Sequence, residues 1–374
     1  MKITVATGPM LPVPTLRGGA VPRMWQGLAE HFARAGHEVT IFARAFPGQP
    51  ERETLAGVRY QRWGGFDQSL SVRNDLLKDL AYAVRACRRL PSADILITND
   101  FWLPVFASRR RTVGRVVINA NRFPKGQFWL YKKAARIAAA SSPVRDAIAA
   151  QCPALAERTR VFPNPIDTAV FRPGPPRRAG GGSKTLLYVG RVHPEKGVHL
   201  LVEAFRAIHP KRSNWRLRIV GPTAVAQGGG GVAYAERLAN LAEGLPVEIS
   251  EPIYDLAQLA DCYRAADLFC YPSIAEQGES FGVAPLEAMA CGVVPVVSAL
   301  ACFRDFINAG ENGLVFDHRA DRPTIGLSEQ LLTATGDDAL RATMATRAAQ
   351  TARRFSYETV AADYLKDFAT LLAA

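Results

Sequence analysis

The chain has 374 residues, of which 48% are hydrophobic and 21% charged, and its formal net charge is +12. A chain of this length is too long for one ordinary core and suits two domains, and the composition is that of a globular protein. Because no run of about 18 apolar residues occurs, we expect no membrane-spanning helix.

The positive charge is concentrated in the first half of the chain. Residues 1–178 hold 28 Lys and Arg against 12 Asp and Glu, whereas residues 179–374 hold 18 against 22. A basic excess of this kind suits an anionic membrane surface, an acidic acceptor or nucleic acid. The sequence has no recognised nucleic-acid module, so we expect no nucleic-acid partner.

The cysteines and the start of the chain both indicate the cytoplasm. The six cysteines are scattered without a CxxC pair, which is typical of proteins in reducing compartments. The chain enters its first predicted strand directly, without a signal peptide. We therefore expect a cytoplasmic location, with peripheral contact at the inner face of the plasma membrane as an additional option.

Strands and helices alternate in the first half, which is the pattern of a doubly wound α/β domain. The predicted elements are strands at Lys2–Ala6, Glu38–Ala43, Val58–Trp63, Asp94–Thr98 and Arg115–Ile118, and helices at Pro22–Ala35 and Asp75–Leu90. Gly18 and Gly19 precede the first helix. A glycine turn at this point can hold a phosphate, or it can simply be a tight turn.

Polar and aromatic residues follow two later strands of this half. Asn99 opens the segment NDFWLPVF at the carboxyl end of a strand, where α/β proteins bind ligands. This segment can line an acceptor pocket, although core packing explains most of its aromatic residues. Asn119 and Asn121 lie after the next strand, and their amide groups can hydrogen-bond sugar hydroxyls. We predict that these two asparagines bind the sugar or the acceptor.

The segment FWLYKKAARIAAA, which begins at Phe128, mixes aromatic with basic residues. Trp129 and Tyr131 lie beside Lys132 and Lys133 in this predicted helix. Such a helix suits docking on anionic lipid, and an ordinary solvated helix with a core-facing stripe explains the same pattern.

A run rich in Pro, Gly and Arg at 172–183 predicts a linker between two domains. The elements predicted beyond it are strands at Thr185–Val189, Trp215–Gly221, Val247–Ser250, Leu268–Tyr271, Val293–Val297 and Leu314–Phe316, and a helix at Leu256–Ala266. Gly190, Arg191 and Lys196 follow the first of these strands. Arg can fork two phosphate oxygens and Lys supplies a compact charge, so this pattern predicts a phosphate site, with a plain surface pair as the alternative.

The most informative stretch runs from Tyr271 to Ser298 and predicts a strand end, a polar loop and a helix of about two turns. Gly282 marks the helix start, where a close backbone approach and free N–H groups favour phosphate or diphosphate. Glu279 and Glu287 flank this start at a separation on the order of 10 Å, which suits a sugar and a ribose at the two ends of a diphosphate. Two other interpretations stay open: solvated glutamates on an ordinary crossover, and a glycosidase carboxylate pair, whose separation is about 5 to 9.5 Å.

Several of these residues together resemble a known family. Glu279, the segment Ser280-Phe281-Gly282, Glu287 and Gly292 are similar to the E-x7-E signature of the retaining family-four glycosyltransferases, which have the GT-B fold. The segment from Gly190 to Gly197 also resembles the G-R-x4-K-G motif of that family. The resemblance implies an enzyme that transfers a sugar from a nucleotide-sugar.

The same resemblance implies the domain organisation. Residues 1–171 would form a Rossmann-like domain that binds the acceptor, and residues 184–355 a second Rossmann-like domain that binds the nucleotide-sugar. The two domains would face a cleft. The C-terminal helix 356–374 would cross back over the first domain.

The family also implies roles for single residues. Arg191 and Lys196 would meet the charge of the departing diphosphate, and Glu279 would bind the transferred sugar as the third catalytic residue. The donor-binding residues would be Gly18, Gly19, Gly190, Ile253, Ser280, Phe281, Gly282 and Glu287, the last of them on the ribose. No DxD triplet occurs and the histidines lack ligand spacing, so we expect no metal and no other cofactor.

The chain also departs from the family pattern at two places. Asn119 and Asn121 occupy the neighbourhood where many relatives carry a histidine that contacts the sugar. Cys302, Phe303 and Asp305 replace a glycine pair and a glutamate, which changes the expected wall of the sugar pocket.

From these observations we expect transfer of a hexose from a UDP-sugar, with a GDP-sugar as the second choice. The expected acceptor is a polysaccharide or a lipid-linked glycan in bacterial cell-surface glycan synthesis, because the basic first half suits work beside a membrane. The alternative is a GT-B protein that binds a nucleotide-sugar and epimerises or hydrolyses it, or that has no transferase activity.

Overall fold

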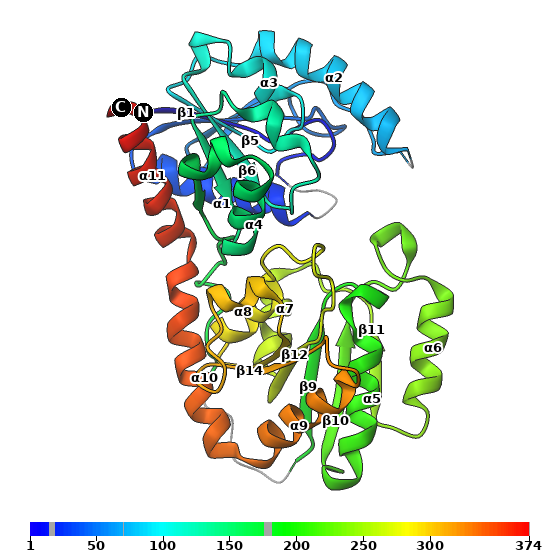
Figure 1. The fold of residues 1–374 in the computed structure, drawn as a ribbon. Coiled ribbons are helices and arrows are strands. Elements are labelled where there is room, and N and C mark those ends of the chain that lie inside the picture. Colours follow the sequence, from blue (N-terminus) through cyan, green and yellow to red (C-terminus); the bar gives the residue numbers. More distant parts are fainter. Residues whose placement is uncertain (15–18, 70, 176–181, 374) are drawn as a thin grey trace. The chain divides into compact units, whose positions relative to one another are not determined.

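The computed structural model describes residues 1–14, 19–69, 71–175 and 182–373. They form two compact units, one of Met1–Pro165 with Tyr357–Ala374 and the other of Ile166–Ser356 (Figure 1). The second unit begins before the predicted linker at 172–183. The reason is local packing, since the Ile166 N–H donates to the Phe355 carbonyl and Phe171 packs edge-on against Tyr263.

The first unit is built on an eight-stranded sheet with the order β3-β4-β2-β1-β5-β6-β7-β8. Every neighbouring pair is parallel except β3 with β4. The strands are Lys2–Ala6 (β1), Glu38–Ala43 (β2), Arg52–Leu55 (β3), Val58–Arg62 (β4), Ile95–Thr98 (β5), Arg115–Ala120 (β6), Arg136–Ala139 (β7) and Thr159–Val161 (β8). The central strands are almost wholly apolar because helices cover both of their faces.

Two layers of helices enclose this sheet. Helices α1 and α11 share one apolar core with the sheet, and α2, α3 and α4 share the other. Their bounds are Ala20–Arg34 (α1), Val72–Arg89 (α2), Leu103–Ala107 (α3), Ser142–Gln151 (α4) and Tyr357–Ala373 (α11). Gly27 of α1 lets α11 approach, because a Cβ atom there would lie 2.4 Å from the Tyr357 ring.

The second unit has a six-stranded parallel sheet with the order β11-β10-β9-β12-β13-β14. The strands are Lys184–Val189 (β9), Trp215–Val220 (β10), Val247–Ser250 (β11), Leu268–Tyr271 (β12), Pro295–Ser298 (β13) and Leu314–Phe316 (β14). The helices are Val198–Ile208 (α5), Val232–Ala242 (α6), Leu256–Arg264 (α7), Val283–Ala290 (α8), Pro323–Gly336 (α9) and Asp338–Ala352 (α10).

Each sheet has a point at which the strand order reverses. In the first unit this point lies between β1 and β5, and in the second between β9 and β12. Loops that leave two such strands diverge to opposite faces, so a crevice forms at their carboxyl ends. The segments that follow β9 and β12 carry Arg191, Lys196 and Glu279, which places these predicted site residues at the reversal point of the second sheet.

The helix predicted from Phe128 onward is wrong. A short 3-10 helix at Gln127–Tyr131 and strand β7 occupy this segment instead. Phe128 and Tyr131 are buried in the core, and only Trp129 of the three aromatic side chains is exposed. Among the described residues no helix is both long enough and apolar enough to cross a membrane.

A buried ion pair ties the C-terminal helix to the first sheet. Arg136 of β7 donates from Nε to Asp367 Oδ2 at 2.8 Å, and Arg160 of β8 reaches Oδ1 at 2.6 Å. The Asp367 side chain is 3% exposed and that of Arg136 is 7% exposed. Without the carboxylate, Arg136 would remain as a buried and uncompensated charge.

We predict that Asp367→Ala lowers the free energy of unfolding of the first unit by about 3–5 kcal/mol, the usual cost of breaking a buried pair. Asp363→Ala is the matched control, because Asp363 is exposed on the same helix. Urea unfolding of the two variants measures the difference. Equal stability of both variants would contradict the role of this ion pair.

Candidate functional site

The loop from β9 to α5 carries the first part of the candidate site. Gly190 follows the strand, a 3-10 turn at Pro194–Lys196 comes next, and Gly197 is the N-cap of α5 with φ at +66°. A Cβ atom on Gly197 would lie 2.1 Å from the Pro272 carbonyl oxygen. The glycine therefore lets this loop pack directly on the loop that follows β12, and this contact brings Lys196 to Glu279.

Lys196 and Glu279 form a buried ion pair. The Lys196 Nζ atom lies 2.6 Å from Glu279 Oε2, and the two side chains are 6% and 10% exposed. The Tyr271 hydroxyl donates to the same oxygen at 3.0 Å, and the ammonium group lies 5.7 Å from the Tyr271 ring centre. Tyr271, the last residue of β12, therefore contacts both members of the pair.

Tyr271 keeps its proton throughout the physiological pH range. Burial, together with the nearby charge of Glu279, raises its pKa well above the ordinary value. Tyr188, which stacks on it at 5.7 Å between ring centres, has its pKa raised for the same two reasons. Because an ammonium group has three donors and one is directed to Glu279, Lys196 can still donate to an anion while it remains paired.

Arg191 lies at the surface of the same site. Its Nη2 atom lies 2.6 Å from Glu195 Oε1, and its Nη1 atom donates to the Gly228 carbonyl at 3.0 Å. These contacts use part of the five-donor guanidinium fork, and the side chain is 43% exposed. Arg191 is therefore oriented by its neighbours and accessible to a ligand.

The helix start predicted at Gly282 is confirmed, since α8 begins at Val283 with Gly282 as its N-cap at φ +86°. A Cβ atom on Gly282 would lie 2.4 Å from the Phe303 ring. Phe281 is 1% exposed and packs on Phe306 and Phe355, so it can offer a ligand only its main chain. Ser280 is half-buried at the same turn.

Glu287 lies within α8 and is half-buried. The hydroxyl of Tyr263 in α7 donates to its Oε2 atom at 3.0 Å. Burial first, and then the charge of Glu287, raises the pKa of this tyrosine well above its usual value, so the donor persists. Glu287 is therefore a carboxylate held in one orientation.

The structure places the remaining predicted site residues at several different points. Ile253 is half-buried in the segment between β11 and α7 of the second unit. Gly19 is the N-cap of α1, and Gly18 lies outside the described residues. Asn119 is buried on β6 beside Tyr364, and Asn121 follows that strand. Within the described ranges no group of three or more His, Cys, Asp and Glu is arranged to hold a metal ion.

A buried acidic pair, which the sequence analysis missed, lies at the reversal point of the first sheet. Asp100 follows β5 and its Oδ1 atom accepts from the N–H groups of Trp102 and Leu103 at 3.0 and 3.1 Å. Asp79 of α2 accepts from the same Trp102 N–H at 3.3 Å. The position of Asp100, two residues after the end of a buried strand, was the available signal.

The two carboxyl groups share an apolar environment. Burial raises the pKa of Asp79 to about 6, and it raises the pKa of Asp100 well above the ordinary value, with the charge of Asp79 adding to the effect. The neighbouring Tyr82 and Tyr131 also have raised pKa values, mainly through burial. The pair is therefore most stable when it carries a proton.

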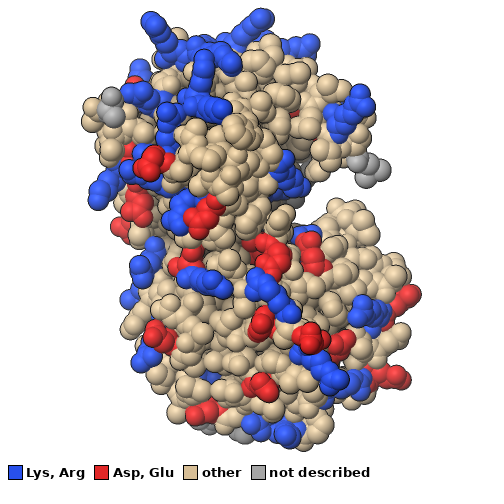
Figure 2. Space-filling view, viewed as in Figure 1, with Lys and Arg blue, Asp and Glu red and all other residues tan. Residues whose placement is uncertain are grey.

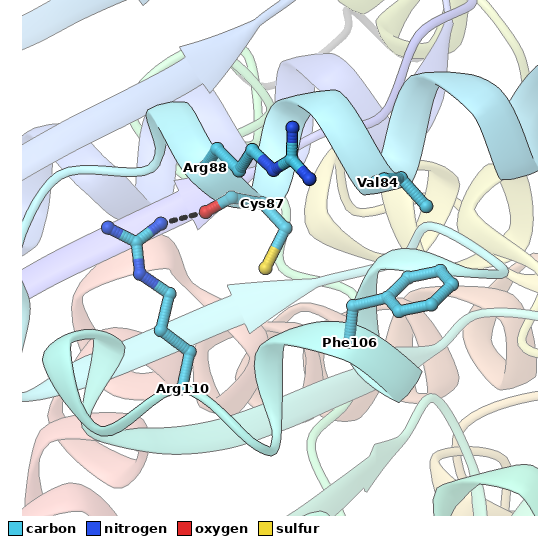
Figure 3. A pocket seen from close by; sticks show the side chains of 5 residues that line it. All are labelled: Val84, Cys87, Arg88, Phe106 and Arg110. Atoms are coloured by element: carbon cyan, nitrogen blue, oxygen red, sulfur yellow. Dashed lines mark hydrogen bonds between the residues drawn. The ribbon is translucent and has the colours of Figure 1, made fainter.

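The first unit also has an open apolar pocket of about 420 Å³ between α2 and α3 (Figure 3). Val84, Cys87 and Phe106 line it together with Arg88 and Arg110. A guanidinium donor of Arg110 bonds the Cys87 carbonyl, which fixes this side chain at the rim.

Known proteins are similar to this chain over most of its length. Two family models match most of the chain, Glycosyltransferase Family 4 over residues 18–170 and Glycosyl transferases group 1 over residues 176–351. The sucrose-phosphate synthase of Thermosynechococcus elongatus is a similar solved structure, with a TM-score of 0.79, 22% identity, and coverage of 100% of this chain and 99% of that one. Anabaena HepE in complex with UDP and glucose has a TM-score of 0.73 at 17% identity and covers 99% of this chain and 100% of that one.

Curated relatives match over different lengths. A D-inositol 3-phosphate glycosyltransferase of Kineococcus radiotolerans is 28% identical over 95% of this chain and 91% of its own. Another of that name, from Acidothermus cellulolyticus, is 34% identical over 54% of this chain and 46% of its own. The phosphatidyl-myo-inositol mannosyltransferase of Mycolicibacterium smegmatis is 31% identical over 60% of this chain and 55% of its own. The last two matches thus span about half of those relatives.

The two parallel-sheet α/β domains and their structural neighbours define the GT-B fold, which confirms the predicted fold class. Both halves of the chain match glycosyltransferase family models. The chain belongs to the family-four glycosyltransferases.

The acidic pair generates a pH prediction. The folded pKa of Asp79 lies above the ordinary value of 3.8, so the folded state binds the proton more tightly than the unfolded state does. The free energy of unfolding should therefore fall as pH rises from about 4 through about 6, by on the order of 3 kcal/mol, because one pKa unit corresponds to about 1.4 kcal/mol. Asp79→Asn should make this dependence shallower, because the amide donates a hydrogen bond without titrating and Asp100 remains as the one buried acid of the pair.

Thermal unfolding between pH 4 and pH 8 measures the effect on the first unit. Asp146→Asn is the control, since Asp146 is exposed on α4 of the same unit. A loss of stability with rising pH that is as steep in Asp79→Asn as in the wild type would contradict the assignment.

Proposed function

We propose that this protein is a retaining and metal-independent hexosyltransferase that uses a nucleotide-sugar donor, with a UDP-hexose first and a GDP-sugar second. The observation that carries the proposal is the arrangement of Lys196, Arg191 and the start of α8 at the reversal point of the second sheet. Two cationic side chains and a helix N-terminus are suited to stabilising a diphosphate as it departs.

In the proposed reaction the acceptor hydroxyl attacks the anomeric carbon from the face that the diphosphate leaves. The bond from this carbon to the diphosphate oxygen breaks as the new glycosidic bond forms, and a phosphate oxygen takes the proton of the acceptor. Glu279 is the partner of Lys196 and a ligand of the sugar hydroxyls, and not a nucleophile. Glu287 binds the ribose, and its contact with Tyr263 sets its direction.

Several observations support a UDP-sugar and an anionic acceptor. UDP and UDP-2-fluoro glucose are named for two of the structural neighbours. The curated relatives are named for inositol 3-phosphate and phosphatidyl-myo-inositol, which both carry a phosphate. The first unit holds 26 Lys and Arg against 14 Asp and Glu, whereas the second is balanced. We therefore assign a glycan, lipid-linked or polyol acceptor with negative charge to the first unit, in bacterial cell-surface glycan synthesis.

We also propose that the protein is located in the cytoplasm and makes peripheral contact with the anionic inner face of the plasma membrane. Lys and Arg side chains gather over the upper end of the first unit in Figure 2. The exposed basic residues of α2, of the segment after α3 and of the first position of β6 are Arg73, Lys78, Arg85, Arg88, Arg89, Arg109, Arg111 and Arg115. Val72, Leu77 and Val84 are exposed among them, and the apolar pocket of Figure 3 lies beside them. This combination of apolar and basic groups suits an interfacial surface.

Release of free nucleoside diphosphate tests the proposed transfer. UDP-glucose and GDP-mannose are incubated with the protein, with and without inositol 3-phosphate or a lipid-linked glycan, in the presence of a chelator. Transfer predicts release that depends on the acceptor. Release without an acceptor would instead indicate a hydrolase, and binding without release would indicate a protein without transferase activity.

In this assay Lys196→Ala should lower kcat by about a hundredfold to a thousandfold, because it removes a charge that stabilises the leaving group. Lys211→Ala is the control, as Lys211 is exposed in the same unit. Circular dichroism at the assay temperature excludes unfolding as the cause. Full activity of a folded Lys196→Ala protein would contradict the assigned role.

The membrane proposal is tested by sedimentation with vesicles of phosphatidylcholine, with or without phosphatidylserine. Reversal of charge at Arg85, Arg88 and Arg111 should weaken binding to the anionic vesicles by about a hundredfold, at about 1 kcal/mol per basic residue. The control reverses Lys211, Arg237 and Arg347, which are exposed in the second unit. Equal binding of the two triple variants would overturn the proposal.

A further inference from the structure

The loop between β12 and α8 carries Glu279. A cluster of charged side chains, which has no role in the proposed reaction, contacts the central part of this loop. Glu276 lies in this loop, three residues before Glu279. His318 and Arg319 follow β14, the strand at the edge of the same sheet. The three side chains therefore join the loop of one strand to the end of another.

Both residues after β14 contact the Glu276 carboxylate. Arg319 lies 2.7 Å from Oε1 through Nε and donates to Oε2 through Nη2 at 2.9 Å, which makes a two-pronged ion pair. Its Nη1 atom donates to the Ala299 carbonyl after β13 at 3.2 Å. Arg319 thus connects the ends of three neighbouring strands, and this rigid fork cannot be replaced by a lysine without loss of contacts.

His318 is the third member of the cluster and its side chain is buried. Its side chain is 3% exposed, and its Nε2 atom lies 2.8 Å from Glu276 Oε1. Its Nδ1 atom is buried and has no hydrogen-bond partner among the described residues. Burial acts to raise the pKa of Glu276, but the bonds from His318 and Arg319 outweigh it and leave the pKa below its usual value.

The position of Glu276 links this cluster to Glu279. The Ala275 carbonyl accepts from the N–H groups of Gly278 and Glu279 at 3.1 and 2.9 Å, so residues 275–279 form a tight turn. On one side, the Ile274 N–H donates to the Glu195 carbonyl at 2.9 Å, beside Lys196. On the other side, the Glu276 side chain attaches the turn to Arg319. The turn that presents Glu279 is therefore fixed at two points.

The contribution of the Glu276–Arg319 ion pair to the free energy of folding is too small to explain this cluster. The Glu276 and Arg319 side chains are 47% and 48% exposed, and an exposed ion pair contributes about 0–1 kcal/mol to folding. Displacement of a group that binds a reacting substrate by about 1 Å can cost a hundredfold in rate. The contribution of a clamp on this turn is therefore expected in the reaction and not in the melting temperature.

We propose that Arg319, supported by His318, is a positioning residue that holds the 275–279 turn through Glu276 and so places the Glu279 carboxylate on Lys196 and toward the transferred sugar. The inference rests on the proposed transferase function for its effect on rate. The fixed position of the turn itself does not depend on that function.

Hydrogen exchange of the 272–282 peptide and steady-state transfer test this inference on the full-length protein. Arg319→Gln and Glu276→Gln should speed amide exchange in this peptide and lower kcat by roughly tenfold to a hundredfold. The affinity for UDP and the melting temperature should stay close to those of the wild type. Arg319→Lys should restore part of kcat, and the control Arg322→Gln, at an exposed arginine next along the chain, should change nothing.

The outcomes separate the two proposals. A wild type that transfers no sugar from UDP-glucose or GDP-mannose contradicts the proposed function, and the exchange measurement then decides alone whether Arg319 fixes the turn. Unchanged exchange in Arg319→Gln overturns the inference. In an active wild type, faster exchange with an unchanged kcat also overturns it, and so does a fall in melting temperature that accounts for the lost rate.

Discussion

The buried contact between the Lys196 ammonium group and the Glu279 carboxylate is the constraint on which the candidate site depends. The two charges lie 2.6 Å apart, their side chains are only 6% and 10% exposed, and the Tyr271 hydroxyl donates to the same carboxylate oxygen. Removal of either partner would leave the other buried and unpaired, at a cost of about 3–5 kcal/mol. The pair is therefore fixed before any ligand binds, and a site fixed in advance needs little reorganisation when negative charge develops.

The parallel sheet of the second unit explains how residues far apart in sequence form this site. Strands β9 and β12 are neighbours at the point where the strand order reverses, and the loops after them carry Lys196 and Glu279. Gly197 lets the two loops touch, because any side chain there would overlap the Pro272 carbonyl. The backbone thus brings the charges together, and the cluster around Arg319 holds the far side of the same loop.

Sequence patterns predicted these strands well because short apolar runs between polar turns are typical of strands buried on both faces. The helix predicted for the alanine-rich segment after Phe128 was wrong. Alanine favours helices, but Arg136–Ala139 pairs with β6 and β8 and forms a strand. The Glu276 cluster joins residues 42 and 43 positions apart, and Lys196 and Glu279 are 83 apart. Side-chain pairs of that kind follow from strand order, which periodicity alone does not specify. The acidic pair Asp79 and Asp100 was missed for the same reason.

The central claim is that fixed cations of the second unit, without a divalent ion, receive the charge of the departing diphosphate. The most direct measurement is a crystal structure of the protein with UDP, grown with magnesium present. The account predicts a diphosphate within hydrogen-bonding distance of Lys196 Nζ and the Arg191 guanidinium, with its oxygens at the start of α8 and no bridging metal. A diphosphate bound elsewhere, or held through a magnesium ion, would contradict it.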